Sequence, residues 1–352
     1  MNIEEIPTPA LLLDLDAFEA NLERMASLVK QAGKALRPHA KAHKCLEIAR
    51  RQMEAGAVGV CVATLAEAEM MAEGGITQML LTSPVADPAK MARIVATGAM
   101  VVADHLDQVT WYNQAAEDAG RTLEMLVDMD VGDHRTGAAT KDDVIAIAEA
   151  IEDASNLTFR GVQAYSVLGS HAGGRHEREE VSQRVFRTVA QTVGAMRRGG
   201  MRVDIVTGGS TGSAEFDLRV PELTELQAGS YVFMDMAYRK EGVEYPQALY
   251  VLGTVVSANH SGFVTVDAGT KAFSTDRGYP PAVVDLGAST FRWGGDEFGY
   301  VDLISAPREL KLGDRVWFLP PHCDPTVNLY DRIYACRGGE VEHVWPVKRA
   351  SL

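Results

Sequence analysis

Eight short apolar runs alternate with amphipathic segments along most of the chain, and this alternation restricts the possible fold more than any other feature. The runs lie at 35–41, 58–64, 78–83, 99–104, 123–130, 159–166, 203–209 and 225–233. Most of the segments between them carry apolar residues at helical spacing. Eight buried strands that mostly alternate with helices predict a (β/α)8 barrel, an α/β fold of the TIM type, whereas a miscounted strand would leave an open doubly wound sheet.

The character of the sequence changes beyond residue 240. The segments 253–269 and 329–347 contain short alternating runs interrupted by glycine or asparagine, with little helical periodicity. We therefore predict a barrel domain at 16–240 and a separate all-β domain at 241–352, completed by an N-terminal strand at 7–15.

Composition narrows the class of protein. The chain has 352 residues, of which 46% are hydrophobic, so it can bury a large core. Its net charge of -14 disfavours nucleic acid and anionic membranes as partners. The four cysteines lack CxxC spacing, which favours reduced thiols. The acidic N-terminus does not resemble a signal peptide, and no apolar run approaches the roughly 18 residues of a membrane span, so we expect a soluble cytoplasmic protein.

Polar residues cluster where the predicted strands end. Barrel active sites are built at the carboxyl ends of the strands. These ends hold Lys41, Thr64, Asp130 followed by Arg135, Tyr165 followed by His171, and a glycine-rich loop at 208–213. We therefore expect these residues to face one site.

The glycine-rich loop follows the seventh predicted strand, and Gly229 and Ser230 lie in the eighth. Barrels commonly bind a phosphate at this place through backbone N–H groups. The loop sequence alone favours a flexible turn, whereas its position in the strand order favours phosphate binding.

Lys41 closes the first predicted strand. A lysine in a barrel mouth near a phosphate site suggests a Schiff base with pyridoxal phosphate. The neighbouring cations Arg37 and Lys44 are expected to lower the pKa of its amine. A solvated basic loop is the alternative, and the residues alone do not decide between the two.

Two further strand ends suit an aromatic ligand. Arg135 fits a phenolate or a carboxylate, although most such arginines form surface ion pairs. Tyr165 could pack flat on an aromatic ring or belong to the core.

The segment 320–326 holds His322 and Asp324 between prolines. In an extended segment, side chains at this spacing project on the same side and could share a metal ion. We expect the prolines to stiffen the segment. A surface histidine with ordinary partners is the alternative.

Short motifs stand in a fixed order along nearly the whole chain. They are R-P-H-A-K-A-H-K at 37–44, D-V-G-D-H-R-T-G at 130–137, G-V-Q-A-Y at 161–165, G-G-S-T-G at 208–212, L-Q-A-G-S-Y at 226–231, D-A-G at 267–269 and P-H-C-D at 321–324. In order and spacing they resemble the fold-type III pyridoxal phosphate enzymes, specifically the D-threonine aldolase and D-serine dehydratase family, which is related to alanine racemase.

The resemblance implies a role for each predicted cofactor residue. Lys41 would bind pyridoxal 5'-phosphate covalently, Arg135 would face its phenolic oxygen, and Tyr165 would lie by the pyridine ring. The phosphate would be held by Ser210, Thr211, Gly212, Gly229 and Ser230. Gln227 stands where racemases direct an arginine toward the ring nitrogen. Neither an amide nor an arginine protonates that nitrogen, so we expect a weaker electron sink than a carboxylate partner would give.

The late motif distinguishes two branches of the resembled family. Its dehydratases resemble H-x-C with zinc, and its aldolases resemble H-x-D with an ion such as manganese or magnesium. Here His322 and Asp324 form H-x-D, and a carboxylate suits Mn²⁺ or Mg²⁺, with Co²⁺ or Zn²⁺ as alternatives. Many relatives carry a histidine in an E-E-H-G element where this chain has Phe298, which can neither ligate a metal nor transfer a proton.

The resemblance predicts an aldolase that cleaves D-β-hydroxy-α-amino acids to glycine and an aldehyde, with His171 as the base. The alternatives are a dehydratase acting on D-serine or 3-hydroxyaspartate, a non-catalytic carrier of pyridoxal phosphate, and a metal-dependent sugar-phosphate barrel enzyme. A small D-amino acid is the expected partner. The family also implies a homodimer with active sites near the interface.

Overall fold

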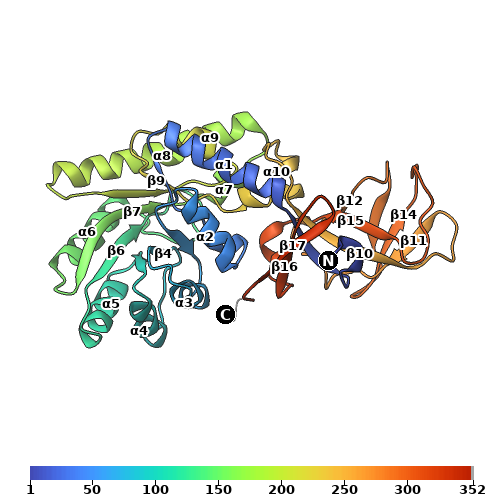
Figure 1. The fold of residues 1–352 in the computed structure, drawn as a ribbon. Coiled ribbons are helices and arrows are strands. Elements are labelled where there is room, and N and C mark those ends of the chain that lie inside the picture. Colours follow the sequence, from blue (N-terminus) through green and yellow to red (C-terminus); the bar gives the residue numbers. More distant parts are fainter. Residues whose placement is uncertain (350–352) are drawn as a thin grey trace. The chain divides into compact units, whose positions relative to one another are not determined.

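The computed structural model describes residues 1–349, which divide into two units (Figure 1). The barrel unit comprises Arg24–Lys41 and Ile48–Gly229, and the β unit comprises Met1–Glu23, Ala42–Glu47 and Ser230–Arg349. The domain bounds expected from the sequence, 16–240 and 241–352, stay a prediction.

The barrel unit is built on one sheet of eight strands, all of which pair in parallel. The strands are β2 (Ala35–Leu36), β3 (Val60–Val62), β4 (Met79–Leu81), β5 (Met100–Ala103), β6 (Leu123–Asp128), β7 (Leu157–Ala164), β8 (Ile205–Gly208) and β9 (Glu225–Leu226). They follow the order β2-β9-β8-β7-β6-β5-β4-β3, and a parallel bridge between His39 and Cys61 joins the two ends. Seven of the predicted runs contain one of these strands, and the run at 159–166 overlaps β7, which begins two residues earlier, so the predicted TIM-type barrel is confirmed.

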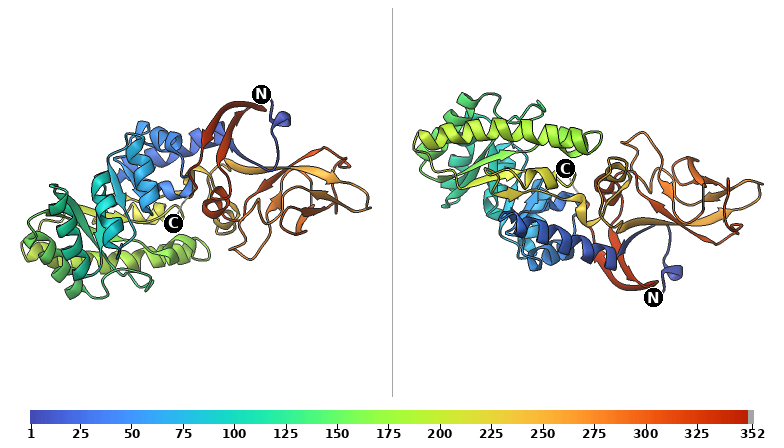
Figure 2. Two further views of the ribbon diagram at one scale, coloured as in Figure 1. Left: turned by 90° about the horizontal axis from the view of Figure 1, so that it is seen from below. Right: turned by 90° about the horizontal axis from the view of Figure 1, so that it is seen from above.

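Helices connect the strands and lie on the outer side of the sheet, where the long helix α8 is conspicuous (Figure 2). They are α1 (Leu15–Gln31), α2 (Leu46–Glu54), α3 (Leu65–Glu73), α4 (Pro88–Thr97), α5 (Leu106–Asp118), α6 (Lys141–Asp153), α7 (Val167–His171), α8 (Arg175–Arg198), α9 (Ala214–Asp217) and the 3-10 helix η2 (Ala40–Ala42). Their starts are set by local side chains: the Thr64 hydroxyl caps α3, and Thr140 and Asp143 form a capping box at α6. None of the described helices combines the length and apolar composition that a membrane crossing requires.

A buried ion pair joins the first and last barrel strands. Arg37 Nε donates to Glu225 Oε2 at 2.8 Å and Arg37 Nη2 donates to Glu225 Oε1 at 2.9 Å, with both side chains less than a tenth exposed. Gly59 leaves room for this guanidinium, because a Cβ there would lie 2.3 Å from Arg37 Nη1. The sequence led us to expect that Arg37 lowers the pKa of the Lys41 amine. In the structure this guanidinium is paired with a carboxylate 188 positions away, and its effect on Lys41 stays a prediction.

Replacing Arg37 by methionine is expected to lower the free energy of unfolding by about 3–5 kcal/mol, because the Glu225 carboxylate would stay buried without its partner. The matched control is Arg93→Met. Arg93 makes the same two-pronged contact with Glu69 but is 62% exposed, so its loss should cost about 0–1 kcal/mol. Urea unfolding measures both, and equal losses in the two variants would contradict the assigned role of burial.

The β unit contains a nine-stranded sheet, in agreement with the predicted C-terminal β domain. Its strands are β1 (Ala10–Asp14), β10 (Leu249–Ser257), β11 (Phe263–Val266), β12 (Ala282–Val283), β13 (Thr290–Trp293), β14 (Gly299–Asp302), β15 (Arg315–Leu319), β16 (Arg332–Arg337) and β17 (Glu340–Pro346). The N-terminal strand β1 pairs antiparallel with β10 and parallel with β16. Short helical elements complete the unit: η1 (Ile3–Glu5), η3 (Ser230–Val232), α10 (Met236–Lys240) and α11 (Cys323–Val327).

Candidate active site

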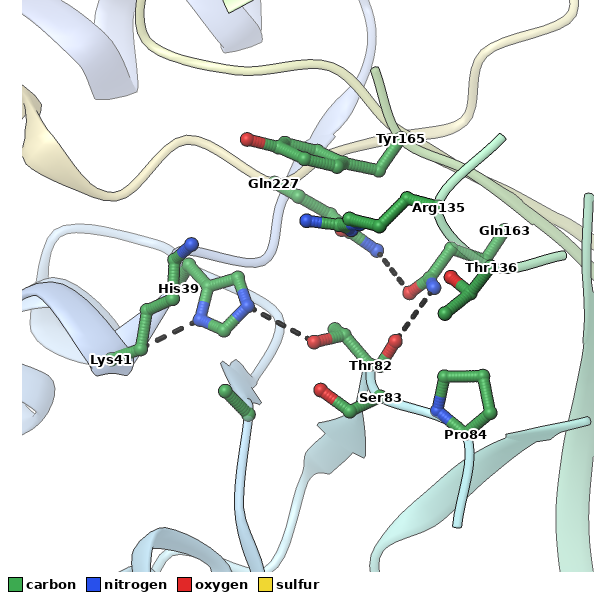
Figure 3. A pocket seen from close by; sticks show the side chains of 11 residues that line it. His39, Lys41, Thr82, Ser83, Pro84, Arg135, Thr136, Gln163, Tyr165 and Gln227 are labelled. Carbon is green, nitrogen blue, oxygen red and sulfur yellow. Dashed lines mark hydrogen bonds between the residues drawn. The ribbon is translucent and has the colours of Figure 1, made fainter. Parts of the chain in front are cut away.

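A cavity of about 300 Å³ opens in the barrel unit, where several strands end (Figure 3). Its lining is His39, Lys41, Ala63, Thr82, Ser83, Pro84, Arg135, Thr136, Gln163, Tyr165 and Gln227. The structure thus brings together Lys41, Arg135, Tyr165 and Gln227, which come from segments spread over most of the barrel sequence. They form a cavity with an amine, a guanidinium, an aromatic ring and an amide.

Lys41 and Arg135 both lie near the ring of Tyr165. The Lys41 Nζ atom is 5.9 Å from the ring centroid, and the Arg135 Cζ atom is 4.9 Å from it. Lys41 belongs to η2, the next element after β2 in the chain, and Tyr165 directly follows β7. The strand ends therefore place a cation, an amine and an aromatic face around one space, as the barrel prediction required.

The loop that carries Arg135 is held by its own carboxylate. Asp130 accepts hydrogen bonds from the backbone N–H of Gly132 at 2.9 Å and of His134 at 3.1 Å, and it contacts His134 Nδ1 at 2.6 Å. These contacts fold residues 130–134 into a tight turn. Arg135 therefore extends from an ordered loop.

His39 was not predicted as a lining residue, and its contacts define its tautomer. The Lys41 backbone N–H donates to His39 Nδ1 at 3.4 Å, so Nδ1 is the acceptor. His39 Nε2 lies 3.0 Å from Thr82 Oγ1, which itself donates to the Val62 carbonyl. Nε2 therefore carries the ring proton and donates it to the threonine oxygen. The motif at 37–44 contained this residue, but only the fold shows which atoms it engages.

A buried polar network beneath the cavity was also missed. Gln227 Nε2 donates to Gln163 Oε1 at 3.2 Å and to Thr207 Oγ1 at 3.1 Å. Gln163 Nε2 donates to the Thr82 carbonyl at 2.8 Å and to Asp128 Oδ1 at 2.9 Å. Asp128 is buried, and this burial raises its pKa to about 6, although hydrogen bonds from Gln163 and Thr136 oppose the rise. The network fixes the orientation of both amides.

The predicted phosphate residues do not line this cavity. Ser210, Thr211 and Gly212 follow β8, and both hydroxyl side chains are buried. Ser210 Oγ lies 2.8 Å from Ser213 Oγ, which donates to Asp217 Oδ2 at 2.5 Å. Gly209 has a φ of +75°, and a Cβ there would come within 2.6 Å of the Asp217 carboxylate. The loop is therefore an ordered turn that is held by hydrogen bonds to Asp217, in contrast to the flexible turn that its composition suggested.

Gly229 and Ser230 stand where the chain passes from the barrel unit into the β unit. Ser230 begins the 3-10 helix η3 and is buried. Their assignment to the phosphate stays a prediction, as does that of Ser210, Thr211 and Gly212.

Asp217 makes the free energy of unfolding of the barrel unit depend on pH. Its carboxylate accepts from Ser182 Oγ at 2.6 Å, and burial raises its pKa from 3.8 to about 6. The folded state therefore binds this proton more tightly than the unfolded chain does, and stability falls as pH rises from about 4 to about 6. Asp217→Asn should remove up to about 3 kcal/mol of that fall, whereas the exposed Asp153→Asn should leave it intact. The free energy of unfolding is measured between pH 4 and pH 6 for the wild type, Asp217→Asn and Asp153→Asn. If it changed with pH by the same amount in all three proteins, the raised pKa of Asp217 would be refuted.

The metal motif lies in the β unit and differs from its predicted shape. His322 is extended and occupies the N-cap position of α11 without a side-chain capping hydrogen bond, but Asp324 lies in the first turn of this helix. The prediction of one extended segment is wrong because Pro325 occupies a position near a helix start, where proline is tolerated since its missing N–H has no intrahelical acceptor. The spacing of two residues therefore does not by itself place the two side chains on one side.

Two further carboxylates support this motif and were not predicted. His322 Nδ1 lies 2.7 Å from Asp276 Oδ2, and the buried Asp235 accepts from the Cys323 backbone N–H at 2.8 Å. Metal-bound histidines commonly donate their second ring nitrogen to a carboxylate in this way. The donor set of His322 and Asp324 fits a divalent ion whose remaining ligands are water. Within residues 1–349, three or more metal-ligating side chains do not gather at one point.

Asp324 also has neighbours that a bare surface carboxylate would lack. Its Oδ1 accepts from Cys323 Sγ at 3.2 Å and from Ser230 Oγ at 3.4 Å. Burial raises the pKa of the Cys323 thiol, which keeps it in the protonated form that donates to Asp324. The cysteine between the two predicted ligands therefore acts here as a hydrogen-bond donor.

His171, the predicted base, ends α7 and is half-buried. It is not part of the cavity lining. The start of α7 is fixed by Asp133, which accepts from Ser166 Oγ at 2.7 Å and from the Val167 backbone N–H. The loop that carries Arg135 and the helix that carries His171 are thus tied together.

His43 and Lys44 belong to the β unit. His43 Nδ1 accepts from the Cys45 backbone N–H at 3.1 Å, and the Lys44 carbonyl accepts from the Lys348 backbone N–H at 3.0 Å. Lys44 has a positive φ of 48°. Phe298 is 45% exposed.

Comparison with known proteins places this fold and site in a class. Residues 13–237 match the family model "Alanine racemase, N-terminal domain", and residues 248–336 match the model "Putative serine dehydratase domain". The parallel barrel and the β-sheet domain are those of the alanine racemase-like, fold-type III class, whose cofactor is pyridoxal phosphate.

Full-length relatives narrow this class. The chain is 38% identical over 353 residues to D-threonine aldolase of Arthrobacter sp, covering 98% of this chain and 93% of the relative. It is 37% identical over 369 residues to 3-hydroxy-D-aspartate aldolase of Paracoccus denitrificans (strain Pd 1222), covering 99% and 93%. The crystal structure of D-threonine aldolase from Filomicrobium marinum superimposes with a TM-score of 0.95 at 35% identity, covering 99% and 96%. The chain belongs to the family of D-threonine aldolase and 3-hydroxy-D-aspartate aldolase, so the resemblance seen in its motifs is confirmed.

Proposed function

We propose that the protein is a lyase, dependent on pyridoxal phosphate and a divalent metal, that cleaves D-β-hydroxy-α-amino acids to glycine and an aldehyde. The observation that carries the proposal is the convergence of Lys41, Arg135, Tyr165 and Gln227 on one cavity at the strand ends. The activities in the names of the relatives, D-threonine aldolase and 3-hydroxy-D-aspartate aldolase, support the reaction class.

The residues of the cavity fit the cofactor. Lys41 would hold it covalently, and the donor-only guanidinium of Arg135 suits its phenolate oxygen. The Tyr165 ring offers a face to the pyridine ring, and the ordered turn at Ser210, Thr211 and Gly212, with Gly229 and Ser230, would receive the phosphate. Bound pyridoxal phosphate supplies an electron sink for the electrons left at Cα when the Cα–Cβ bond breaks.

The remaining residues would act on the substrate hydroxyl. We assign to His171 the removal of the β-hydroxyl proton, which retro-aldol cleavage requires. His322 and Asp324 would hold Mn²⁺ or Mg²⁺, with Asp276 orienting His322. A divalent ion supplies Lewis-acid chemistry in such a site.

A dehydratase is the second candidate, because residues 248–336 match a serine dehydratase model. The carboxylate of Asp324 favours the aldolase, since the dehydratase motif resembles H-x-C. Incubation with D-threonine and Mn²⁺ separates the two reactions. An aldolase gives glycine and acetaldehyde, whereas a dehydratase gives ammonia and 2-oxobutanoate. Detection of the second pair alone would overturn the proposal.

Two further points complete the proposal. A panel containing D-threonine, 3-hydroxy-D-aspartate and β-phenylserine would identify the preferred side chain of the substrate. A protein that binds the cofactor without converting any of them would be a carrier. We also propose a homodimer, for which light scattering should give about twice the chain mass of 38.1 kDa.

A further inference from the structure

The orientation of the Gln227 amide follows from a chain of hydrogen bonds that begins at a backbone carbonyl. The Thr82 carbonyl oxygen lies 2.8 Å from the Gln163 amide and can only accept. The Gln163 group that faces it is therefore the NH₂, and Asp128 Oδ1 accepts from the same nitrogen at 2.9 Å. The Gln163 oxygen must then point the other way, toward Gln227.

Gln227 has only one way to meet this oxygen. Its NH₂ donates to Gln163 Oε1 at 3.2 Å and to Thr207 Oγ1 at 3.1 Å, so both of its N–H bonds are used. The Gln227 oxygen is left as its only other polar atom. Gln227 lines the cavity, and within residues 1–349 its side-chain hydrogen bonds are the two that its NH₂ donates. The cavity is thus offered an acceptor at this position.

Arg135 offers the opposite chemistry. Its guanidinium has donors and no acceptor, and it lines the same cavity near the Tyr165 ring. In Figure 3, Arg135 and Gln227 lie together on the side of the cavity away from Lys41. A heteroaromatic ring bound to Lys41 through the carbon para to its nitrogen would direct that nitrogen to this side.

The Arg135 guanidinium and the Gln227 oxygen therefore accept different polar atoms of the ring as partners. A phenolate oxygen can pair with Arg135 but not with the Gln227 oxygen, because both oxygens are acceptors. A ring nitrogen can pair with the Gln227 oxygen only when it carries a proton. An unprotonated nitrogen at the same place would bring two lone pairs together in a buried position.

We propose that Gln227 presents its side-chain oxygen to the cofactor's ring nitrogen and thereby binds the cofactor with that nitrogen protonated. Gln163 is a positioning residue, since it fixes the Gln227 amide. The chain of amides ends on Asp128, whose negative charge lies behind aligned dipoles and favours a positive charge at the ring. The inference rests on the cofactor part of the proposed function and deepens it. It replaces the sequence-based expectation that an amide leaves the ring nitrogen unprotonated, because the hydrogen bonds of Gln163 and Gln227 leave an oxygen for that nitrogen.

The experiment uses the whole protein, freed of cofactor and reloaded with pyridoxal phosphate carrying nitrogen-15 in its ring. Solid-state nitrogen-15 NMR at neutral pH distinguishes pyridinium from pyridine by chemical shift. The wild-type protein is expected to show the pyridinium signal. Gln227→Arg, which offers only donors, is expected to move the signal to the pyridine position, whereas Gln227→Glu, which offers only acceptors, should keep it at the pyridinium position.

Several outcomes overturn the inference. A pyridine signal from the wild-type protein does so alone, whether or not either variant folds. A pyridinium signal that persists in Gln227→Arg does so as well, because the proton would then depend on another group. The spectrum is independent of turnover, so a protein that cleaves no amino acid yet shows the expected signals would sink the aldolase and leave this inference standing. Failure to bind the cofactor would overturn both.

Discussion

Lys41→Ala is expected to abolish covalent attachment of pyridoxal phosphate and to reduce turnover by a factor on the order of 10³–10⁶, as losses of a covalent catalytic group do. The reason is positional: Lys41 carries the amine that lines the cavity beside Arg135 and Tyr165. Borohydride reduction of the loaded protein, followed by peptide mass mapping, should locate the cofactor on the peptide that contains Lys41.

Lys34→Ala provides the control for this experiment. Lys34 is a lysine of the same unit whose Nζ donates to the Pro221 carbonyl at an exposed position. Its loss should leave both attachment and turnover unchanged. If Lys41→Ala still became covalently labelled after reduction, or if the mapped peptide lay elsewhere, the lysine assignment would be wrong.

Removal of the divalent metal is expected to stop the reaction while leaving the cofactor attached to Lys41. Exhaustive chelation of the wild-type protein and the substitutions His322→Ala and Asp324→Ala should have the same effect, and added Mn²⁺ should restore only the chelated wild type. Asp276→Ala should weaken metal affinity about 10–100-fold, because Asp276 contacts His322 Nδ1 and so orients the ligand.

The exposed Asp296 supplies a matched carboxylate in the same unit, and Asp296→Ala should not alter metal affinity. Metal titrations read by calorimetry, alongside assays of aldehyde release, test the series. Full activity in thoroughly chelated protein would remove the metal from the proposed function. Equal metal affinity of wild type and Asp276→Ala would remove the carboxylate from the site.

Much of the barrel could be predicted because its strands are buried on both faces and read as continuous apolar runs. The positions of Lys41, Arg135 and Tyr165 followed from the rule that barrel sites form at strand ends. The polar network beneath them did not follow. Asp128 and Gln163 meet because they are register partners between β6 and β7, and register between parallel strands is set by packing over the whole sheet.

Other features depend on residues that are distant in sequence. Asp276 reaches His322 from 46 positions away, and no local pattern marks that contact. Arg37 illustrates the same limit, since its motif suggested a cation that lowers the pKa of Lys41, while its partner Glu225 lies on the last strand of the barrel. At 320–326, the prolines were interpreted as stiffening an extended segment, although proline also suits the first turn of a helix.

The pairing of β2 with β9 has a consequence for how the protein folds. The first and last barrel strands must meet across 188 residues, and each contributes only a two-residue ladder supported by the Arg37–Glu225 pair. Closing so long a loop costs conformational entropy, and the favourable contacts between the two strands form only after the loop has closed. This order of events slows folding. The cavity takes residues from both sides of this seam, so the nascent chain cannot complete the cavity until Gln227 has left the ribosome.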